Sequence, residues 1–272
     1  MKERKLYNGE INIQFNDNNH CYIIGDRKWI TSVTACTGLL DKPGLKFWAC
    51  NMMAEQLYEF LDANKEIDVD QLRFQIEEAK KAHTKKARKE ADSGTLVHNW
   101  AEQFILSQIN ETERPQVPED KRVLNGVLAF LKWVESEDVK FVATELLLYS
   151  KEHDFAGLMD FKFTLGKEDH KIIHIGDFKT NKAIYKEDHK IIHTGDFKTS
   201  KAIYNEMLYQ LAGYDLADRE ESGEEHGDGY ILRLDKDSGE FESHIISKED
   251  MKKNEKAFLG LRAVKIREKE LK

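Results

Sequence analysis

The sequence predicts an α+β protein, in which a helical N-terminal part precedes a mixed β-sheet flanked by helices. Two observations support this prediction. Between residues 45 and 136 apolar side chains recur mainly at helical spacing, whereas β-rich runs separated by turn signals dominate from residue 140. The chain has 272 residues, three prolines and no low-complexity linker. We therefore expect one domain over residues 1–272, with N-terminal strands and helices at 1–90 and a core at 91–272.

The N-terminal part should begin with strands and continue as helices. β-rich runs on both sides of a Gly-Asp turn predict short strands over residues 11–34. Apolar spacing predicts a helix over residues 45–61, and a charged helix is expected from about residue 69 to 89. The next helix should begin at Asp92 or Ser93, because both side chains can accept hydrogen bonds from the first turn.

The core should start with a helix that has Pro118 at its beginning. Three strand-like runs follow, "KFVATELLLYS", "FAGLMDFKFTL" and "KIIHIGDF". A helix over residues 205–221, a strand–turn–strand unit over 227–246 and a last helix complete the chain. Ser247, followed by Asp250, gives that last helix a capping-box pattern.

A 19-residue segment occurs twice in tandem within the core, at residues 167–204. Lys167–Tyr185 is repeated at Lys186–Tyr204 with only two differences, Ile175/Thr194 and Asn181/Ser200. Two units are too few for a solenoid, which needs at least three to bury a continuous core. The pattern therefore indicates a duplication inserted into a single fold.

Composition excludes several classes of protein. No apolar run approaches the length of a membrane span, and the N-terminus lacks the apolar region of a secretory signal. The three cysteines, Cys21, Cys36 and Cys50, are odd in number and do not follow a zinc-binding spacing. We expect reduced thiols in a cytoplasmic protein that does not associate with membranes.

Net charge is −8, whereas proteins that merely coat nucleic acid are usually basic. One basic segment, "KKAHTKKARK" at residues 80–89, stands out. A solvated helix face is the preferred interpretation of this segment, and contacts with nucleic-acid phosphates are the alternative.

Four motifs in chain order suggest chemistry. They are His98 on a helix, Glu145 with Gly157-x-x-Asp160, an Asp-x-Lys at Asp177/Lys179 or at its copy Asp196/Lys198, and Gln210-x-x-x-Tyr214. Each motif taken alone can be explained by a structural role. A single histidine on a helix is usually structural, and a Gln–Tyr pair at i, i+4 also fits side-chain packing on one helix face. Asp-x-Lys is more informative, because a buried strand that ends in both charges must pair them or bind a metal ion.

Together the motifs predict a metal site. Asp160 and the Asp of Asp-x-Lys end neighbouring strands, so their carboxylates can converge on one divalent cation, either Mg²⁺ or Mn²⁺. His98 could add a nitrogen ligand, which suits Mn²⁺. The Lys two residues further along can point at the attacking water or at a phosphate, which is an arrangement for phosphodiester hydrolysis.

In this order and spacing the motifs resemble the PD-(D/E)XK nuclease superfamily, and specifically its RecB-like, phage-type exonucleases. The resemblance covers about residues 94–246, and residues 20–49 also resemble the N-terminal region of phage-type members. It implies a restriction-endonuclease-like core and a metal-dependent DNA exonuclease used in phage or prophage recombination. DNA is then the partner, and both a homo-oligomer and a phage recombination partner are compatible with it.

The resemblance also implies residue roles. His98, Asp160 and Asp177, or alternatively Asp196, would be metal ligands. Lys179 or Lys198 would be the catalytic lysine, Gln210 and Tyr214 would place the DNA strand, and Glu145 would have a supporting role. Some relatives carry a four-cysteine iron–sulfur cluster, but this chain has no cysteine after Cys50, so none is expected.

Only one copy of Asp-x-Lys can meet the other motifs, because each of those occurs once. The first copy is slightly preferred, since a short turn connects it to Asp160 and Ile175 suits a core better than Thr194 does. The second copy leads directly into the helix of Gln210, and exchange of copies between protomers is a further alternative. A rival hypothesis is a catalytically impaired DNA-binding or assembly protein derived from such a nuclease, and another is a scaffold without DNA affinity.

Overall fold

The computed structural model describes residues 1–165, 192–200 and 202–271. Contacts divide the chain into two compact units, one formed by Met1–Leu39 with His98–Lys272 and the other by Leu40–Val97. The N-terminal strands thus belong to the same unit as the core. The expected subdivision near residue 90 differs from this arrangement, in which a helical segment is inserted after the strands.

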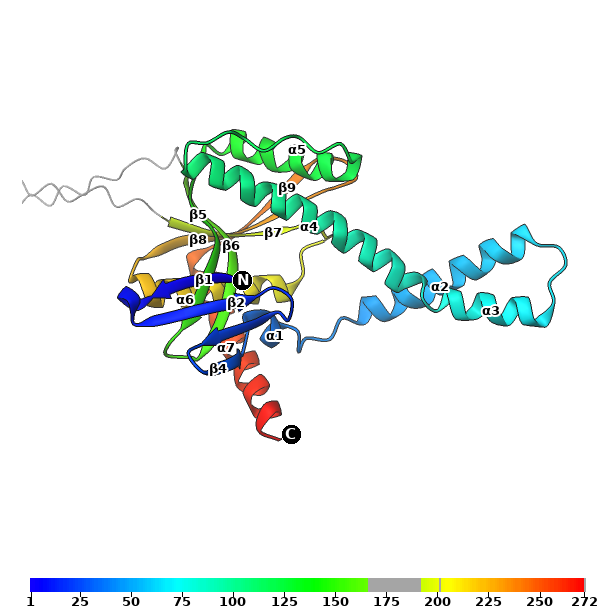
Figure 1. Cartoon of the computed structure of the whole chain (residues 1–272), viewed down its shortest axis with the longest axis horizontal. Helices are drawn as coiled ribbons and strands as arrows, with labels where there is room; N and C mark the ends of the chain where they lie inside the picture. Colours follow the sequence, from blue (N-terminus) through cyan, green and yellow to red (C-terminus); the bar gives the residue numbers. More distant parts are fainter. Residues whose placement is uncertain (166–191, 201, 272) are drawn as a thin grey trace, which may run out of the picture. The chain divides into compact units, whose positions relative to one another are not determined.

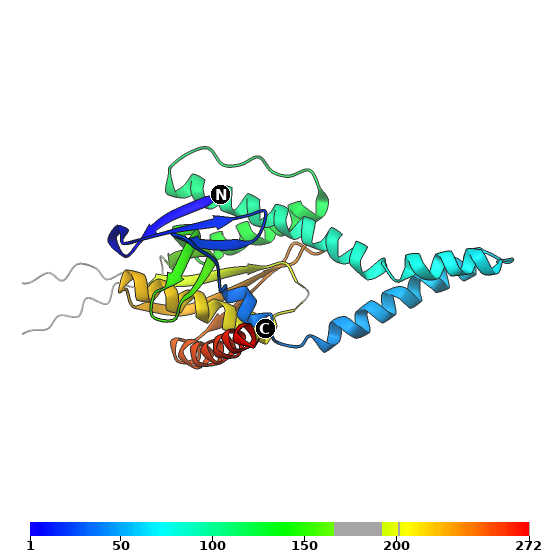
Figure 2. The ribbon, with the colours of Figure 1, turned by 60° about the horizontal axis from the view of Figure 1, so that its bottom comes forward.

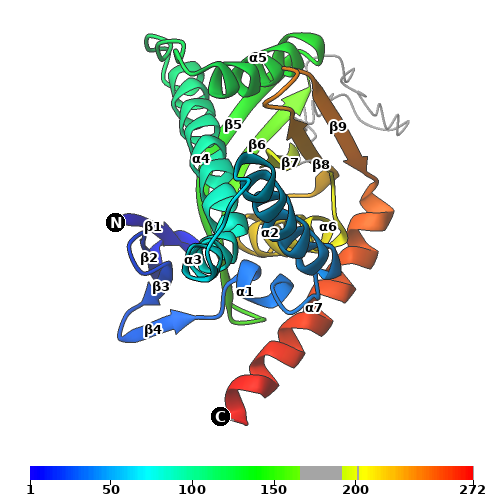
Figure 3. The ribbon, with the colours of Figure 1, turned by 90° about the vertical axis from the view of Figure 1, so that its right-hand side faces the viewer.

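A five-stranded mixed sheet forms the centre of the first unit, and Figure 3 shows its strands side by side in the order β5-β6-β7-β8-β9. The strands are β5 (Val139–Ser150), β6 (Phe155–Leu165), β7 (Ile192–Lys198), β8 (His226–Leu234) and β9 (Phe241–Ile246). β7 and β8 are parallel and are joined through a helix, whereas the other neighbours are antiparallel. The sheet is therefore mixed, as the sequence predicts.

Helices lie on both faces of this sheet (Figures 1 and 2). The C-terminal part of α4 (Ala82–Ile109) and α5 (Lys121–Ser136) cover one face, and α6 (Asn205–Ser222) and α7 (Lys248–Glu270) lie against the other. The α5 face buries an aromatic cluster that includes Phe130, Trp133, Phe161 and Phe163, none of which is exposed. The burial of these large rings stabilises the sheet against the helical layer.

The N-terminal residues form a second, antiparallel sheet in the same unit. Its strands are β1 (Lys2–Leu6), β2 (Ile11–Asn16), β3 (Cys21–Ile24) and β4 (Arg27–Ile30), with the short helices η1 (Tyr7–Gly9) and α1 (Val33–Thr37). Leu6 and Ile13 pack with Leu147 and Tyr149 of β5 in one buried cluster. The alternation of apolar residues in β2 gives this sheet the buried face that the cluster requires.

The second unit is helical. It contains α2 (Pro43–Ala63), α3 (Val69–Ala79) and the N-terminal part of α4. A capping box formed by Asp68 and Gln71 starts α3. The single charged helix expected over residues 69–89 is instead two helices, because α3 ends at Ala79 and α4 starts at Ala82.

Two predicted helix starts are wrong. Asp92 and Ser93 lie inside α4, where Ser93 Oγ donates a hydrogen bond back to the carbonyl of Lys89 at 3.1 Å and does not cap a helix. Because no proline or glycine precedes them, the helix continues through both positions. α5 does not begin at Pro118, since Asp120 accepts hydrogen bonds from the amides of Arg122 and Val123 and so starts the helix later.

The α+β class and most elements of the core are confirmed. α6, the β8–β9 unit and α7 with its Ser247 cap lie where the sequence predicts them. The predicted strand "KIIHIGDF" lies outside the described residues. Within the described residues all three cysteines are free thiols, and no helix has the length and apolar character that a membrane span requires.

Candidate functional site

The antiparallel pairing of β6 with β7 brings two aspartates opposite each other. Phe161 pairs with Gly195, so the preceding residue of β6, Asp160, faces the following residue of β7, Asp196. Gly195 permits this pairing because a Cβ there would lie only 2.1 Å from the ring of Phe161. The amide of Phe197 donates a hydrogen bond to Asp160 Oδ2 at 2.7 Å and fixes that carboxyl group beside β7.

Asp196 is buried, Asp160 is half-buried, and the two carboxyl groups are electrostatically coupled. Burial raises the pKa of Asp160 to about 6 and that of Asp196 to about 6, although the charge of Lys198 lowers both. The negative charge of Asp160 further raises the pKa of Asp196. A hydrogen bond with Asp196 lowers the pKa of Asp160. A nearby positive charge would favour the ionised forms.

Lys198 supplies such a charge at the end of β7. Its Nζ lies 2.5 Å from Asp196 Oδ2 and donates a hydrogen bond to Gln210 Oε1 at 3.4 Å. Burial lowers the pKa of Lys198, but the carboxylates of Asp196 and Asp160 outweigh burial and raise the pKa above its usual value. The lysine is therefore a fixed ammonium group.

The Gln–Tyr helix completes this arrangement. Gln210 Nε2 donates a hydrogen bond to the hydroxyl of Tyr214 at 2.8 Å, one turn further along α6. Burial raises the pKa of Tyr214 well above its usual value, so the phenol stays neutral. Gly157 makes room for the tyrosine, since a Cβ there would lie 2.6 Å from its ring. The Gly157-x-x-Asp160 and Gln210-x-x-x-Tyr214 motifs are thus in direct contact.

His98 approaches the carboxyl pair from α4. Its Nδ1 lies 3.8 Å from Asp160 Oδ2, and its ring packs edge-on against Phe197 with centroids 5.8 Å apart. Burial lowers the pKa of His98, which favours the neutral imidazole that can bind a metal ion.

Glu145 also faces this region. Thr144 pairs with Phe161 and Leu146 pairs with Met159, so Glu145 lies opposite Asp160 in the β5–β6 register. It has a φ of 48°, a left-handed conformation that costs a non-glycine residue free energy within a strand. Lys2 Nζ, 2.6 Å from Glu145 Oε2, compensates its charge.

The same residues bear on metal binding. Among the described residues no group of three or more His, Cys, Asp or Glu side chains meets the geometry of a bound ion. The chemistry of the donors nevertheless fits Mg²⁺ or Mn²⁺, since two adjacent carboxyl groups and a neutral imidazole are ligands of such cations. Asp196 Oδ2 is also buried without a well-directed hydrogen bond, despite the ammonium beside it.

The Asp-x-Lys beside Asp160 is that of the second copy. Asp196 and Lys198 occupy β7, whereas Asp177 and Lys179 of the preferred first copy lie outside the described residues. The second copy continues directly into α6, which carries Gln210. This connection outweighs the shorter turn after Asp160 and the apolar Ile175, which favour the first copy.

A separate buried ionic network lies between β6, α6 and β8. His226 contacts Asp215 through Nδ1 at 2.7 Å and Asp218 through Nε2 at 3.1 Å. Lys162 reaches Asp218 at 2.7 Å, and Arg219 binds Asp215 at 2.8 Å. The charges of these side chains pair with one another, although Asp218 Oδ2 and His226 Nε2 are buried without a well-directed hydrogen bond, so the network is best explained as structural.

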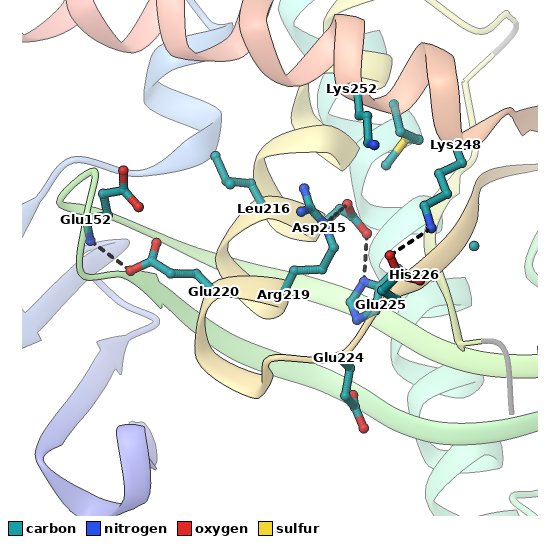
Figure 4. Close-up of a pocket in the computed structure, with 12 residues that line it drawn as sticks. Glu152, Asp215, Leu216, Arg219, Glu220, Glu224, Glu225, His226, Lys248 and Lys252 are labelled. Atoms are coloured by element: carbon teal, nitrogen blue, oxygen red, sulfur yellow. Dashed lines mark hydrogen bonds and ion pairs between the residues drawn. The ribbon is translucent and has the colours of Figure 1, made fainter. Parts of the chain in front are cut away.

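A pocket of about 350 Å³ borders this network (Figure 4). Figure 4 shows His226 bound to Asp215 at its inner end and the acidic side chains of Glu220 and Glu224 around it. None of the four predicted motifs contributes to the pocket. Its mixed charges are already paired in part, including Lys248 with Glu225 at 3.5 Å.

The basic segment at residues 80–89 agrees with a solvated helix face for three of its side chains. Lys80 pairs with Glu77, and both Lys81 and Lys85 pair with Glu78. These exposed pairs contribute little to stability.

Sequence reasoning missed Lys2 and the buried network of His226. Lys2 is 143 residues from Glu145 and carries no motif. No family model matches the chain, and no curated protein matches its sequence. The interpretation of the site therefore rests on its chemistry.

Proposed function

We propose that this chain is a metal-dependent deoxyribonuclease that hydrolyses phosphodiester bonds and acts as an exonuclease. The observation that carries the proposal is the meeting of Asp160, Asp196 and Lys198 at one end of the β6–β7 pair. His98 and Gln210 reach the same point from helices on opposite faces of the sheet.

Each residue has a role in this proposal. His98, Asp160 and Asp196 would hold the divalent cation, which would lower the pKa of water and offset the charge of the phosphate. Lys198 stabilises the negative charge that develops on the phosphoryl oxygens as water adds and the deoxyribose oxygen leaves. Gln210 orients the lysine through its Oε1 and is itself held by Tyr214.

Degradation of end-labelled linear and circular DNA, single- and double-stranded, tests the proposal. Purified protein is incubated with Mg²⁺, Mn²⁺ or EDTA. We expect loss of linear DNA with either metal, no loss with EDTA and no loss with Asp160→Asn. Binding of DNA without cleavage under every metal condition would instead favour the impaired DNA-binding protein.

A further inference from the structure

A second pocket of about 350 Å³ lies between the start of α6 and β9. Its lining residues are Ala202, Ile203, Tyr204, Asn205, Leu208, Glu242 and His244. The volume falls in the range of sites for small organic groups, about 300–1,000 Å³.

The sheet register places this pocket beside the catalytic candidates. Asp196 pairs with Ile231 of β8, which pairs with His244 of β9. Paired residues on neighbouring strands share a face of the sheet, so His244 lies on the face that carries Asp196. Two strand spacings separate the residues, or about 10 Å.

A parallel row supports the same conclusion. Lys198 pairs with Arg233, and Arg233 pairs with Glu242 of the pocket. Arg233 thus lies between the lysine and the pocket, and its Nη1 pairs with Asp235 at 3.2 Å. It also binds Glu242 through Nε at 2.7 Å, which fixes that wall of the pocket.

The lining chemistry fits a planar heterocycle. Ile203 and Leu208 form an apolar part of the lining. Tyr204 also lines the pocket and is 50 % exposed. Among the residues that the structure describes, no partner engages the polar ends of the Tyr204, Asn205 or His244 side chains. An aromatic face beside donors and acceptors that have no partner among the described residues is the combination that stacks and hydrogen-bonds an unpaired base.

We infer that this pocket, between the N-terminal end of α6 and β9, binds an unstacked nucleobase of the DNA strand next to the scissile phosphate. Tyr204 stacks on the base, while Asn205 and His244 bind its edge. The inference rests on the proposed nuclease function, which it extends by a subsite for single-stranded DNA.

Binding of a fluorescent 12-nucleotide single strand tests the inference, measured by anisotropy with Ca²⁺ in place of the catalytic metal. We expect Tyr204→Ala to weaken binding about tenfold, because base–aromatic stacking has about this magnitude. Tyr204→Phe should retain most of the affinity, because the ring remains. His244→Ala should weaken binding less, and Ile245→Ala, an exposed neighbour that alternation places on the opposite face of β9, should have no effect.

Abasic substitution provides the decisive comparison. Each nucleotide is replaced in turn, and one position should weaken binding to wild type but not to Tyr204→Ala. If the wild type cleaves DNA while every pocket variant binds and cleaves normally, the inference is overturned and the nuclease proposal stands. If the wild type neither binds nor cleaves DNA, both are overturned.

Discussion

The ammonium of Lys198 lies 2.5 Å from Oδ2 of Asp196, and both residues belong to the second copy of the duplicated segment. This ion pair lies beside Asp160, to which the intervening residue, Phe197, donates its amide hydrogen. The first copy contains the same Asp-x-Lys at Asp177 and Lys179. The chain therefore offers a matched control for each catalytic substitution.

Lys198→Ala should lower nuclease activity at least 100-fold, roughly the cost of removing one group that stabilises transition-state charge. Lys179→Ala should leave activity nearly unchanged. The measurement is the initial rate of cleavage of labelled linear DNA at saturating Mn²⁺. Loss of activity in Lys179→Ala alone would assign catalysis to the first copy, and loss only in the double variant would show that the copies are interchangeable.

The two copies can also be compared by their contribution to stability. Gly195→Ala should lower the free energy of unfolding by about 1–3 kcal/mol, because the added Cβ would lie 2.1 Å from the ring of Phe161. The melting temperature should fall by about 2–4 °C for each kcal/mol. Gly176→Ala is the equivalent substitution in the first copy and should have a smaller effect.

Gly260→Ala controls for the general effect of adding a methyl group to this unit. Gly260 lies within α7 with nothing within 4 Å of an added Cβ, so alanine should stabilise the helix by up to about 1 kcal/mol. Equal destabilisation by Gly195→Ala and Gly176→Ala would contradict the assignment of the second copy to the sheet.

Deletion of Lys167–Tyr185 should leave a folded and active protein, because the deleted sequence is almost identical to the copy that remains. It removes 19 residues from the connection between β6 and β7. This shortens the connection roughly fourfold, and loop-closure entropy then predicts about 1 kcal/mol of added stability. Thermal melting and the cleavage assay check both statements, and an inactive deletion variant would show that the duplication is required.

Local patterns predicted much of the core because they reflect local physics. The period of apolar residues identifies α5, and the Ser247 cap identifies the start of α7. The helix start predicted at Asp92 or Ser93 is wrong because a side chain that can cap a helix is also tolerated inside one. The choice depends on the preceding residues, here a strongly helical run without a breaker.

The sequence predicts which residues form the site, but it does not predict how they are arranged in space. Asp160 and Gln210 each belong to a short motif, whereas the two identical Asp-x-Lys motifs carry the same local signal. Which of them pairs with β6 depends on strand register, which is a tertiary property. Lys2 could not be found from the sequence for the same reason, since only the fold brings it to Glu145.

His226 should make stability depend on pH above about 6.5. Burial lowers its pKa, but hydrogen bonds to Asp215 and Asp218 outweigh burial and raise it above the unfolded value. The protonated ring therefore stabilises the fold fully below about pH 6.5, and this contribution is lost as the pH rises through the folded-state pKa. The slope cannot exceed one proton, about 1.4 kcal/mol per pH unit.

Urea unfolding of wild type and His226→Gln between pH 6.5 and 8.5 checks this dependence. Wild type should lose stability over this range, whereas the variant should lose less. Asp160 and Asp196 have pKa values of about 6, so most of their titration lies below the range. His153→Gln, in which a half-buried histidine outside the network is replaced, should keep the wild-type slope, and an identical slope in His226→Gln would exclude the linkage.

Tyr214→Phe should separate positioning from stability at the site. The substitution removes the hydroxyl that accepts a hydrogen bond from Gln210 Nε2, so the amide can rotate and Oε1 no longer holds Lys198 in place. We expect kcat to fall about tenfold with a smaller change in KM, because the lysine acts mainly on the transition state. Loss of the buried hydrogen bond should cost about 1 kcal/mol of stability.

Tyr209→Phe is the matched control. Tyr209 lies on the same helix, and among the described residues it makes no hydrogen bond to Gln210. It should leave kcat and KM unchanged. Gln210→Ala should lower kcat at least as far as Tyr214→Phe does, and the double variant should be no worse than Gln210→Ala alone, because the tyrosine acts through the glutamine. Additive losses would mean that the Tyr214 hydroxyl contacts the DNA itself.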